Sequence, residues 1–138
     1  MWIELNSKRA SPLLLGFVYR NPTERVDWTD NLISVMDAVW LESKEIILLG
    51  DFNTDLLKPN KSRLQTLEKF HLYQLISTLT RVTATSKTLI DHINVANKLN
   101  IIETCVPVFG CGGHVPVCLT LLKMGVKRPQ DNNVSLFF

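Results

Sequence analysis

Hydrophobic and polar positions follow one another in blocks of strand and helix length along this 138-residue chain. An apolar run from Pro12 to Tyr19 has strand length, and Asn21-Pro22 ends it because proline cannot donate to a ladder. A second apolar run, Glu45 to Leu49, ends at Gly50. Both runs predict buried strands.

Helical spacing follows each of these two runs. The first helix is predicted after a potential cap at Asp27, where apolar residues recur every three or four positions: Trp28, Leu32, Val35, Met36 and Val39. A second helix is predicted over Ser62–Phe70, with Leu64 and Leu67 on adjoining turns. The first half of the chain therefore reads as two strand–helix units.

The second half changes to a strand pattern rich in Val, Ile, Thr and Leu. Strands are predicted over Arg81–Thr85, Thr88–Val95, Ile101–Val108 and Val115–Leu122. Because no repeat or linker interrupts residues 1–123, we expect them to form one domain. Residues 124–138 are expected to be a loose C-terminal tail or linker rather than another core element.

Composition agrees with one globular domain, since 46% of residues are hydrophobic and 20% are charged. The net charge of +2 is too weak to indicate a nucleic-acid partner by itself. The odd number of cysteines and the lack of a signal-peptide pattern after Met1 predict a reduced, intracellular setting, in the nucleus or cytoplasm. Every apolar run is shorter than the roughly 20 residues that span a bilayer, so no membrane association is expected.

Polar chemistry first appears where the second strand ends. Asp51 and Asn53 are two residues apart, so their side chains leave one face while Phe52 turns to the core. A carboxylate and an amide placed in this way can orient a water and hold a phosphate oxygen. The alternative interpretation is a turn in which both side chains satisfy nearby backbone groups.

A second polar feature is Asp91, which stands within an apolar strand pattern. An unpaired carboxylate there would cost several kcal/mol, so a partner is expected. His114, at the mouth of the last strand, is the predicted partner, and such a pair would fix the imidazole tautomer beside a substrate. The rival His92 is expected to be a surface histidine, because neighbouring strand residues point to opposite faces. Alone, His114 would be interpreted as a solvent-facing loop residue.

These features occur in a fixed order that resembles a known family. The segments Val18-Tyr19-Arg20-Asn21-Pro22, Gly50-Asp51-Phe52-Asn53 and Leu89-Ile90-Asp91-His92-Ile93, followed by His114 before Pro-Val, are similar to the successive motifs of the endonuclease/exonuclease/phosphatase superfamily. Within it, they are most similar to the endonuclease domains of non-LTR (LINE-type) retrotransposons. The resemblance covers about residues 2 to 122.

The resemblance implies an α/β (α+β) layered sandwich in which two β-sheets pack face to face with helices outside. It also implies magnesium-assisted hydrolysis of a DNA phosphodiester. Asp51 would activate the water, Asn53 would hold the water or the phosphate, and His114, held by Asp91, would stabilise the scissile phosphate. Tyr19 and Arg20 would contact the substrate; otherwise they would be a packed tyrosine and a solvated arginine.

The chain departs from the family pattern at the metal. The family's first strands, which carry a metal-region Asn and a metal-binding Glu, have no counterpart, so the sequence reads as an N-terminally truncated domain. Glu4 is interpreted as an exposed strand charge rather than a substitute ligand. The family's final Ser-Asp-His is Gly112-Gly113-His114 here, and glycine cannot ligate a metal. No intact set of metal ligands is therefore expected.

Weakened magnesium binding predicts that any enzymatic activity is impaired to near background, since losing one fixed electrostatic group costs roughly 10²- to 10³-fold in rate. The expected partners are DNA and a fused or associated reverse transcriptase; no specific protein partner is predicted. One alternative is an inactive remnant that binds nucleic acid. Another is a zinc site formed by Cys105, Cys111, Cys118 and His114, although their spacing matches none of the paired zinc patterns.

Overall fold

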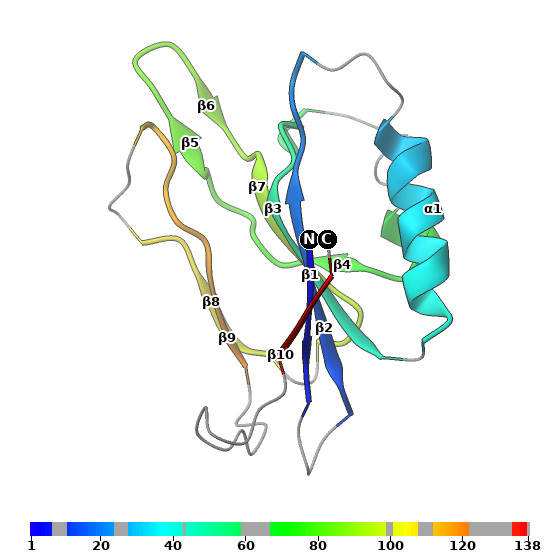
Figure 1. Ribbon diagram of the computed structural model, residues 1–138. Coiled ribbons are helices and arrows are strands. Elements are labelled where there is room, and N and C mark those ends of the chain that lie inside the picture. Colours follow the sequence, from blue (N-terminus) through cyan, green and yellow to red (C-terminus); the bar gives the residue numbers. More distant parts are fainter. Residues whose placement is uncertain are drawn as a thin grey trace.

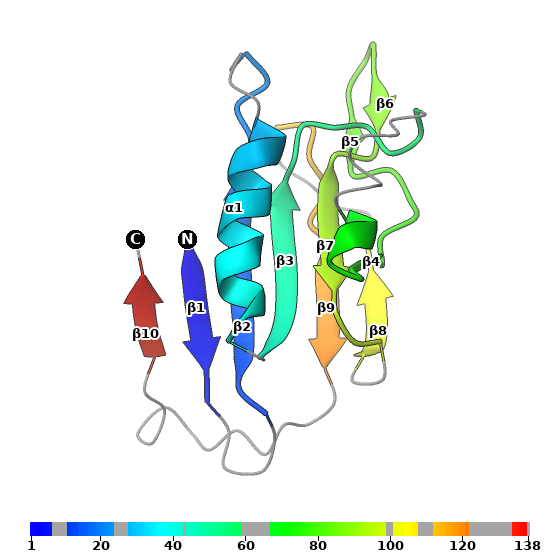
Figure 2. The same cartoon turned by 90° about the vertical axis from the view of Figure 1, so that its right-hand side faces the viewer.

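The protein folds into layers around one large β-sheet. The computed structural model describes residues 1–6, 11–23, 28–42, 44–58, 67–98, 101–107, 112–121 and 134–137. Helix α1 covers one face of the sheet, and two small two-stranded sheets lie on the other side (Figures 1 and 2). The predicted layered α/β architecture is therefore confirmed.

The large sheet has six strands in the order β10-β1-β2-β3-β7-β4, and the small sheets are β5-β6 and β8-β9. The elements in chain order are β1 (Trp2–Leu5), β2 (Leu13–Tyr19), α1 (Trp28–Trp40), β3 (Glu45–Asp51), β4 (Tyr73–Gln74), β5 (Arg81–Val82), β6 (Lys87–Thr88), β7 (Asp91–Val95), β8 (Ile101–Cys105), β9 (Cys118–Leu121) and β10 (Val134–Phe137). Strands β2 and β3 are parallel neighbours, and the other neighbours in the large sheet are antiparallel.

The unit β2-α1-β3 forms the centre of the fold. The two apolar runs become parallel neighbours because α1 carries the chain back along the sheet. The helix presents its apolar stripe to the strands, with Met36 fully buried against Ile46 and Leu48. All three elements lie where the sequence pattern predicts them. The predicted cap, Asp27, lies outside the described residues.

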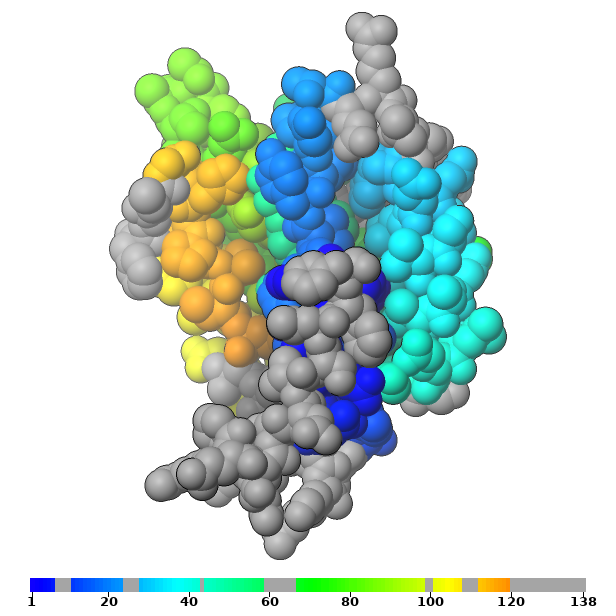
Figure 3. Space-filling model, viewed as in Figure 1, coloured from blue at the N-terminus to red at the C-terminus, as the bar shows by residue number. Residues whose placement is uncertain are grey.

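The sheet has an apolar core on each face. Residues of β3 alternate between them: Ile46 and Leu48 pack on the side of α1, whereas Ile47 packs on the opposite side. The second core also takes in Val117 and Leu119 from the β9 region. In the space-filling view, the segments of β8 and β9 lie on one side of β1 and β2, and α1 lies on the other (Figure 3).

Several elements differ from the sequence-based expectation. Residues 67–69 are helical, but most of the predicted second helix, 62–66, lies outside the described residues. The predicted strand Thr88–Val95 is broken at Leu89 and Ile90, because the backbone groups of these two residues bond to Phe52, Asp55, Leu56 and Thr80. Asp91 is consequently the first residue of β7 rather than the middle of a strand.

The C-terminal residues also differ from the expectation of a loose end. Val134–Phe137 form β10, which pairs antiparallel with β1 at one edge of the large sheet. A short apolar segment can satisfy its backbone groups in this way by adding to an open strand edge. The proposed boundary after residue 123 remains a prediction. Within the described part of the chain, the one long helix, α1, is too short to cross a bilayer.

Candidate active site

Three polar side chains form a row across the ends of neighbouring central strands. Tyr19 of β2 is aligned with Asp51 of β3, and Asp51 is aligned with Asp91 of β7. Residues aligned across a sheet point to the same face, so the phenol and the two carboxylates share one side. Apolar residues of the second core lie beneath them, including Leu49 and Ile93.

His114 completes the group from a different layer. Its Nδ1 lies 3.1 and 3.3 Å from the two carboxylate oxygens of Asp91, so the contact expected from the sequence is present. The side chain of Asp91 is 15% exposed and that of His114 is 36% exposed. With Nδ1 directed at Asp91, the Nε2 edge of the ring is directed away from that carboxylate and is the edge offered to a ligand.

Thr80 joins the two layers, although no pattern in the sequence marks it as a site residue. Its buried hydroxyl oxygen accepts hydrogen bonds from the backbone N–H groups of Ile90 (3.0 Å) and Asp91 (2.9 Å). Its carbonyl accepts the N–H of Val115 at 2.7 Å. One threonine therefore positions the backbone of Asp91 and the residue that follows His114.

The His114 segment is held by further backbone contacts. Arg81 and His114 form an antiparallel bridge, and Val82 N–H donates to the carbonyl of Gly113 at 2.8 Å. These contacts hold the backbone around His114 against residues 80–82, a segment that lies outside the central sheet.

Asp51 and Asn53 form a tight turn at the end of β3. The N–H of Asn53 donates to Asp51 Oδ1 at 2.8 Å, which occupies one of the two carboxylate oxygens. Asn53 Nδ2 donates to the carbonyl of Arg20 at 2.7 Å, and Asn53 has a positive φ of 45°. The Asp51 side chain therefore satisfies a backbone group within the turn, as the turn interpretation expected, whereas the Asn53 side chain bonds to the backbone of the neighbouring strand's end; Phe52 between them is fully buried.

Gly50 explains the close approach of β3 to β2 just before Asp51. It has a φ of 141°, and a Cβ at this position would collide with the carbonyl oxygen of Val18. Glycine is therefore needed for the backbone path that brings Asp51 beside Tyr19.

Tyr19 and Arg20 have different environments. The side chain of Tyr19 is 74% exposed, so it is not a packed core tyrosine. Arg20 is not a solvated arginine, because its Nη1 donates to Thr54 Oγ1 at 2.8 Å and its guanidinium carbon lies 5.1 Å from the centroid of the Trp28 ring. Tyr19 is thus open to a ligand, whereas Arg20 supports the structure next to it.

Two expectations about other ionisable residues were wrong. His92 is fully buried rather than on the surface: its ring stacks on Phe52 with centroids 4.9 Å apart, and its Nε2 lies 3.1 Å from the carbonyl of Leu89. Glu4 is only 17% exposed and binds Lys44 at 2.8 Å. Glu4 has a partner 40 residues away in the chain, and His92 has a partner at the break in the predicted strand. Local alternation reveals neither partner.

Asp51, Asp91 and His114 are close enough to share one ion. Each offers a ligand atom, and these atoms lie within 4.8 Å of one another. Two carboxylates suit a hard divalent cation that keeps several waters, so the residues fit a partial site of that kind. The cysteines of the alternative zinc site do not join His114 in this group; Cys111 lies outside the described residues.

Gly113 contributes nothing to this group, and its backbone explains why glycine suits the position. Its φ is 85°, and an added Cβ would lie 3.1 Å from Thr83 Cγ2. An aspartate in this conformation would be strained. The turn that presents His114 is therefore built around glycine.

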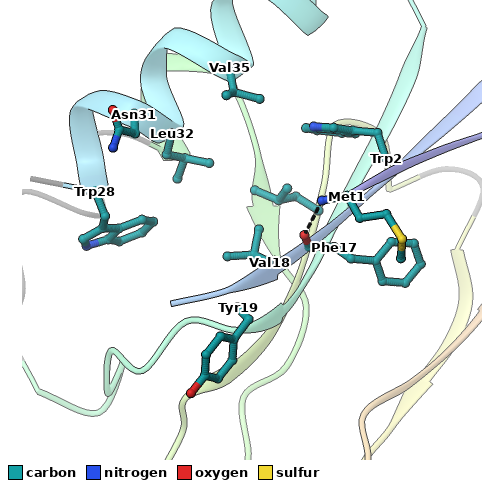
Figure 4. A pocket seen from close by; sticks show the side chains of 10 residues that line it. Met1, Trp2, Phe17, Val18, Tyr19, Trp28, Asn31, Leu32 and Val35 are labelled. Atoms are coloured by element: carbon teal, nitrogen blue, oxygen red, sulfur yellow. Dashed lines mark hydrogen bonds between the residues drawn. The ribbon is translucent and has the colours of Figure 1, made fainter. Parts of the chain in front are cut away.

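The structure has a groove beside α1. It has a volume of about 630 Å³ and is lined by Trp2, Tyr19, Trp28 and other mostly apolar residues (Figure 4). The groove lies on the α1 face of the sheet, whereas the row of polar side chains stands on the face of the second core, so Tyr19 at the end of β2 is the one residue common to both.

Comparison with known proteins supports the fold. Neither a scan against protein-family models nor a search of curated proteins finds a match. The structure is similar to that of an endonuclease/exonuclease/phosphatase family protein from Leptotrichia buccalis C-1013-b, with a TM-score of 0.66 and 17% sequence identity. The similarity covers 86% of this chain and 53% of that protein, so the chain spans about half the length of its structural relative. The fold is thus similar to that of an endonuclease/exonuclease/phosphatase family protein.

Proposed function

We propose that this chain carries a phosphodiester-hydrolase site of the endonuclease type, directed at DNA and strongly impaired in turnover. The observation that carries the proposal is the convergence of Asp51, Asp91 and His114, whose ligand atoms lie within 4.8 Å of one another although the residues come from separate segments. The fold similarity to an endonuclease/exonuclease/phosphatase family protein supports the same reaction class.

In this proposal, each side chain has a defined chemical task. Asp51 accepts a proton from the attacking water, and Asn53 holds the water or a phosphate oxygen. His114 donates a hydrogen bond from Nε2 to a non-bridging phosphate oxygen, while Asp91 keeps the proton of Nδ1 in place. The exposed phenol of Tyr19 hydrogen-bonds the phosphate of the substrate strand. Arg20 assists indirectly, since its guanidinium is bound to Thr54.

Magnesium is the proposed cation, held by Asp51 and Asp91 together with water and substrate phosphate, and its chemistry is to stabilise negative charge on the phosphate and the leaving oxygen. The protein ligands are few, because Gly113 offers no side chain. The chain spans 53% of its structural relative, and we propose that ligands in the remainder of such a fold complete the metal set.

The finer assignment is a retrotransposon-type endonuclease that acts beside a reverse transcriptase, in the nucleus or cytoplasm. It rests on the order of the motifs around Tyr19, Asp51, Asp91 and His114. DNA is favoured as the ligand because the exposed aromatic ring of Tyr19, aligned with Asp51, suits contact with a base or a phosphate.

Plasmid nicking with and without magnesium tests the catalytic part. We expect nicking at or near background, because losing one fixed electrostatic group already costs roughly 10²- to 10³-fold in rate. Clear magnesium-dependent nicking that Asp51→Ala abolishes would contradict the predicted impairment and show that the chain is an active enzyme. The matched control is Asp37→Ala, on the exposed surface of α1.

DNA binding separates the proposed site from a chain with no nucleic-acid role. We expect duplex DNA to bind, with magnesium-dependent nicking near background, and we expect Tyr19→Ala to weaken binding several-fold. Tyr73→Ala is the control, since Tyr73 is also exposed but lies on the edge strand β4. Absence of both DNA binding and hydrolysis would refute the proposal. Binding without any turnover, even at high protein concentration, would identify the inactive nucleic-acid-binding form that Gly113 favours.

A further inference from the structure

Two cysteines face each other across the small β8-β9 sheet. Cys105 is the last residue of β8 and Cys118 is the first of β9, and they are direct partners in the antiparallel ladder. Both are free thiols and both are exposed. Figure 1 shows the two strands side by side, away from α1.

The ladder positions of these cysteines place their Cα atoms in the range that a disulfide bridges. Residues directly opposite each other in an antiparallel pair have Cα atoms about 4.5 or 5.5 Å apart, and disulfides bridge Cα atoms about 4.4 to 6.8 Å apart. The two thiols are also near enough to affect each other's ionisation. Leu119, the next residue, packs into the core, so alternation directs Cys118 outward, where an oxidant can reach it.

Along the sequence, the two cysteines also flank a segment of the candidate active site. Segment 106–117 connects Cys105 to Cys118, and this segment contains His114. A covalent bond between the cysteines would join the two ends of this segment to each other. Val106 and Val117, which flank the pair, pack against the core beneath, so both ends are already anchored to the rest of the molecule.

We propose that Cys105 and Cys118 are a redox modification site that forms a reversible intramolecular disulfide, which closes the segment carrying His114. The co-reactant is a low-molecular-weight disulfide such as oxidised glutathione. A thiolate of the pair attacks it, forms a mixed disulfide and releases one thiol; the second cysteine then displaces the other thiol. The two cysteines lose two electrons and two protons, and the co-reactant is reduced to two thiols.

Partial desolvation of the Cys105 thiol, followed by its hydrogen bond with Cys118, raises the pKa of Cys105. Because the thiolate is the nucleophile, attack by Cys105 is slow at neutral pH and should accelerate as the pH rises.

The test uses the whole chain with Cys111→Ser, which leaves only the proposed pair among the three cysteines. Incubation with oxidised glutathione should give a monomer that has lost the mass of two hydrogen atoms, without a glutathione adduct. Its thermal midpoint should rise by about 10 °C and return on reduction, because the bond constrains the unfolded chain. Adding Cys105→Ser or Cys118→Ser should instead give a stable mixed disulfide and no such rise.

The proposal fails if the Cys111→Ser protein accumulates glutathione adducts at both cysteines or forms only intermolecular dimers. It also fails if the closed form has an unchanged or lower thermal midpoint, which would show that the folded sheet opposes the bond. These readouts do not depend on hydrolysis or DNA binding, so they stand apart from the proposed function.

Discussion

The central strands and the layer that carries His114 differ in how firmly their residues are buried. Ile46, Ile47 and Leu48 of β3 are each 1% exposed, whereas Val82 of β5 and Ile102 of β8 are 42% and 58% exposed. The candidate site draws on both regions: its carboxylates come from the first and its imidazole from the second. Stability and assembly of the site therefore depend on different residues, and substitutions should separate the two.

The largest expected effect is in the central core. Phe52→Ala should lower the free energy of unfolding by about 3–5 kcal/mol, because the phenyl ring is fully buried against His92 and Trp28. Urea denaturation measures this loss. Ile102→Ala on the exposed face of β8 is the control and should change stability by less than about 0.5 kcal/mol. Equal losses for the two variants would contradict the contrast between the regions.

Thr80 should give the next largest effect. Thr80→Val keeps the shape but removes the acceptor for two buried N–H groups, so we expect a loss of about 2–4 kcal/mol. Thr80→Ser keeps the hydroxyl and should lose only about 1 kcal/mol. The imidazole resonances of His114 should shift in the valine variant and stay in place in the serine variant. A valine variant as stable as the serine variant would show that Thr80 does not join the layers.

The contact between Asp91 and His114 should be worth less. A double-mutant cycle with Asp91→Ala and His114→Ala should give a coupling energy of about 1 kcal/mol, since both side chains are partly exposed. The exposed pair Asp37 and Lys69 provides a matched cycle, expected at about 0–0.5 kcal/mol. If the first coupling is no larger than the second, the carboxylate does not hold the imidazole.

The smallest expected effect is a pH dependence from the pair between Glu4 and Lys44. The hydrogen bond from Lys44 lowers the pKa of Glu4 below its ordinary 4.5. The stability that this carboxylate contributes is therefore complete above pH 4.5 and lost as the pH falls through the folded-state value. Glu4→Gln should flatten this acid limb in urea denaturation as a function of pH. If the slope of the acid limb does not change, other carboxylates cause the loss of stability in acid.

The alkaline side of the same pair has the opposite sign. The hydrogen bond to Glu4, and then that to Glu42, raises the pKa of Lys44 above 10.5. Its contribution is complete below pH 10.5 and is lost as the pH rises through the folded-state value. Lys44→Met should remove both the acid and the alkaline contributions, whereas Glu42→Gln should leave most of the acid contribution.

Local pattern was enough to predict the centre of the fold. The strands β2 and β3 are marked by unbroken apolar runs, and α1 is marked by apolar residues at helical spacing along its length, so the positions of these elements follow from the sequence. The break at Leu89 and Ile90 could not be predicted in this way, because the groups that bond to them lie around residues 52–56 and at Thr80. Short strands paired by long-range contacts carry too little periodicity.

The site was predictable to a similar extent. Asp51, Asp91 and His114 stood out because charged or titratable groups interrupt apolar patterns or follow a strand. Thr80 did not, because a threonine hydroxyl costs little in either environment and its partners are ten and eleven residues away. The burial of His92 was missed because alternation gives the side of the sheet but not whether that side is covered.

The turn at Gly50 also limits how this region can vary. Asp51 and Phe52 leave the chain on opposite sides, one toward the carboxylate row and the other into the core beneath α1. Inserting or deleting a single residue within β3 would exchange them, directing a charge into the core and an aromatic ring among the ligands. Natural length variation should therefore be confined to the connections around β3, and the spacing within the strand should stay constant.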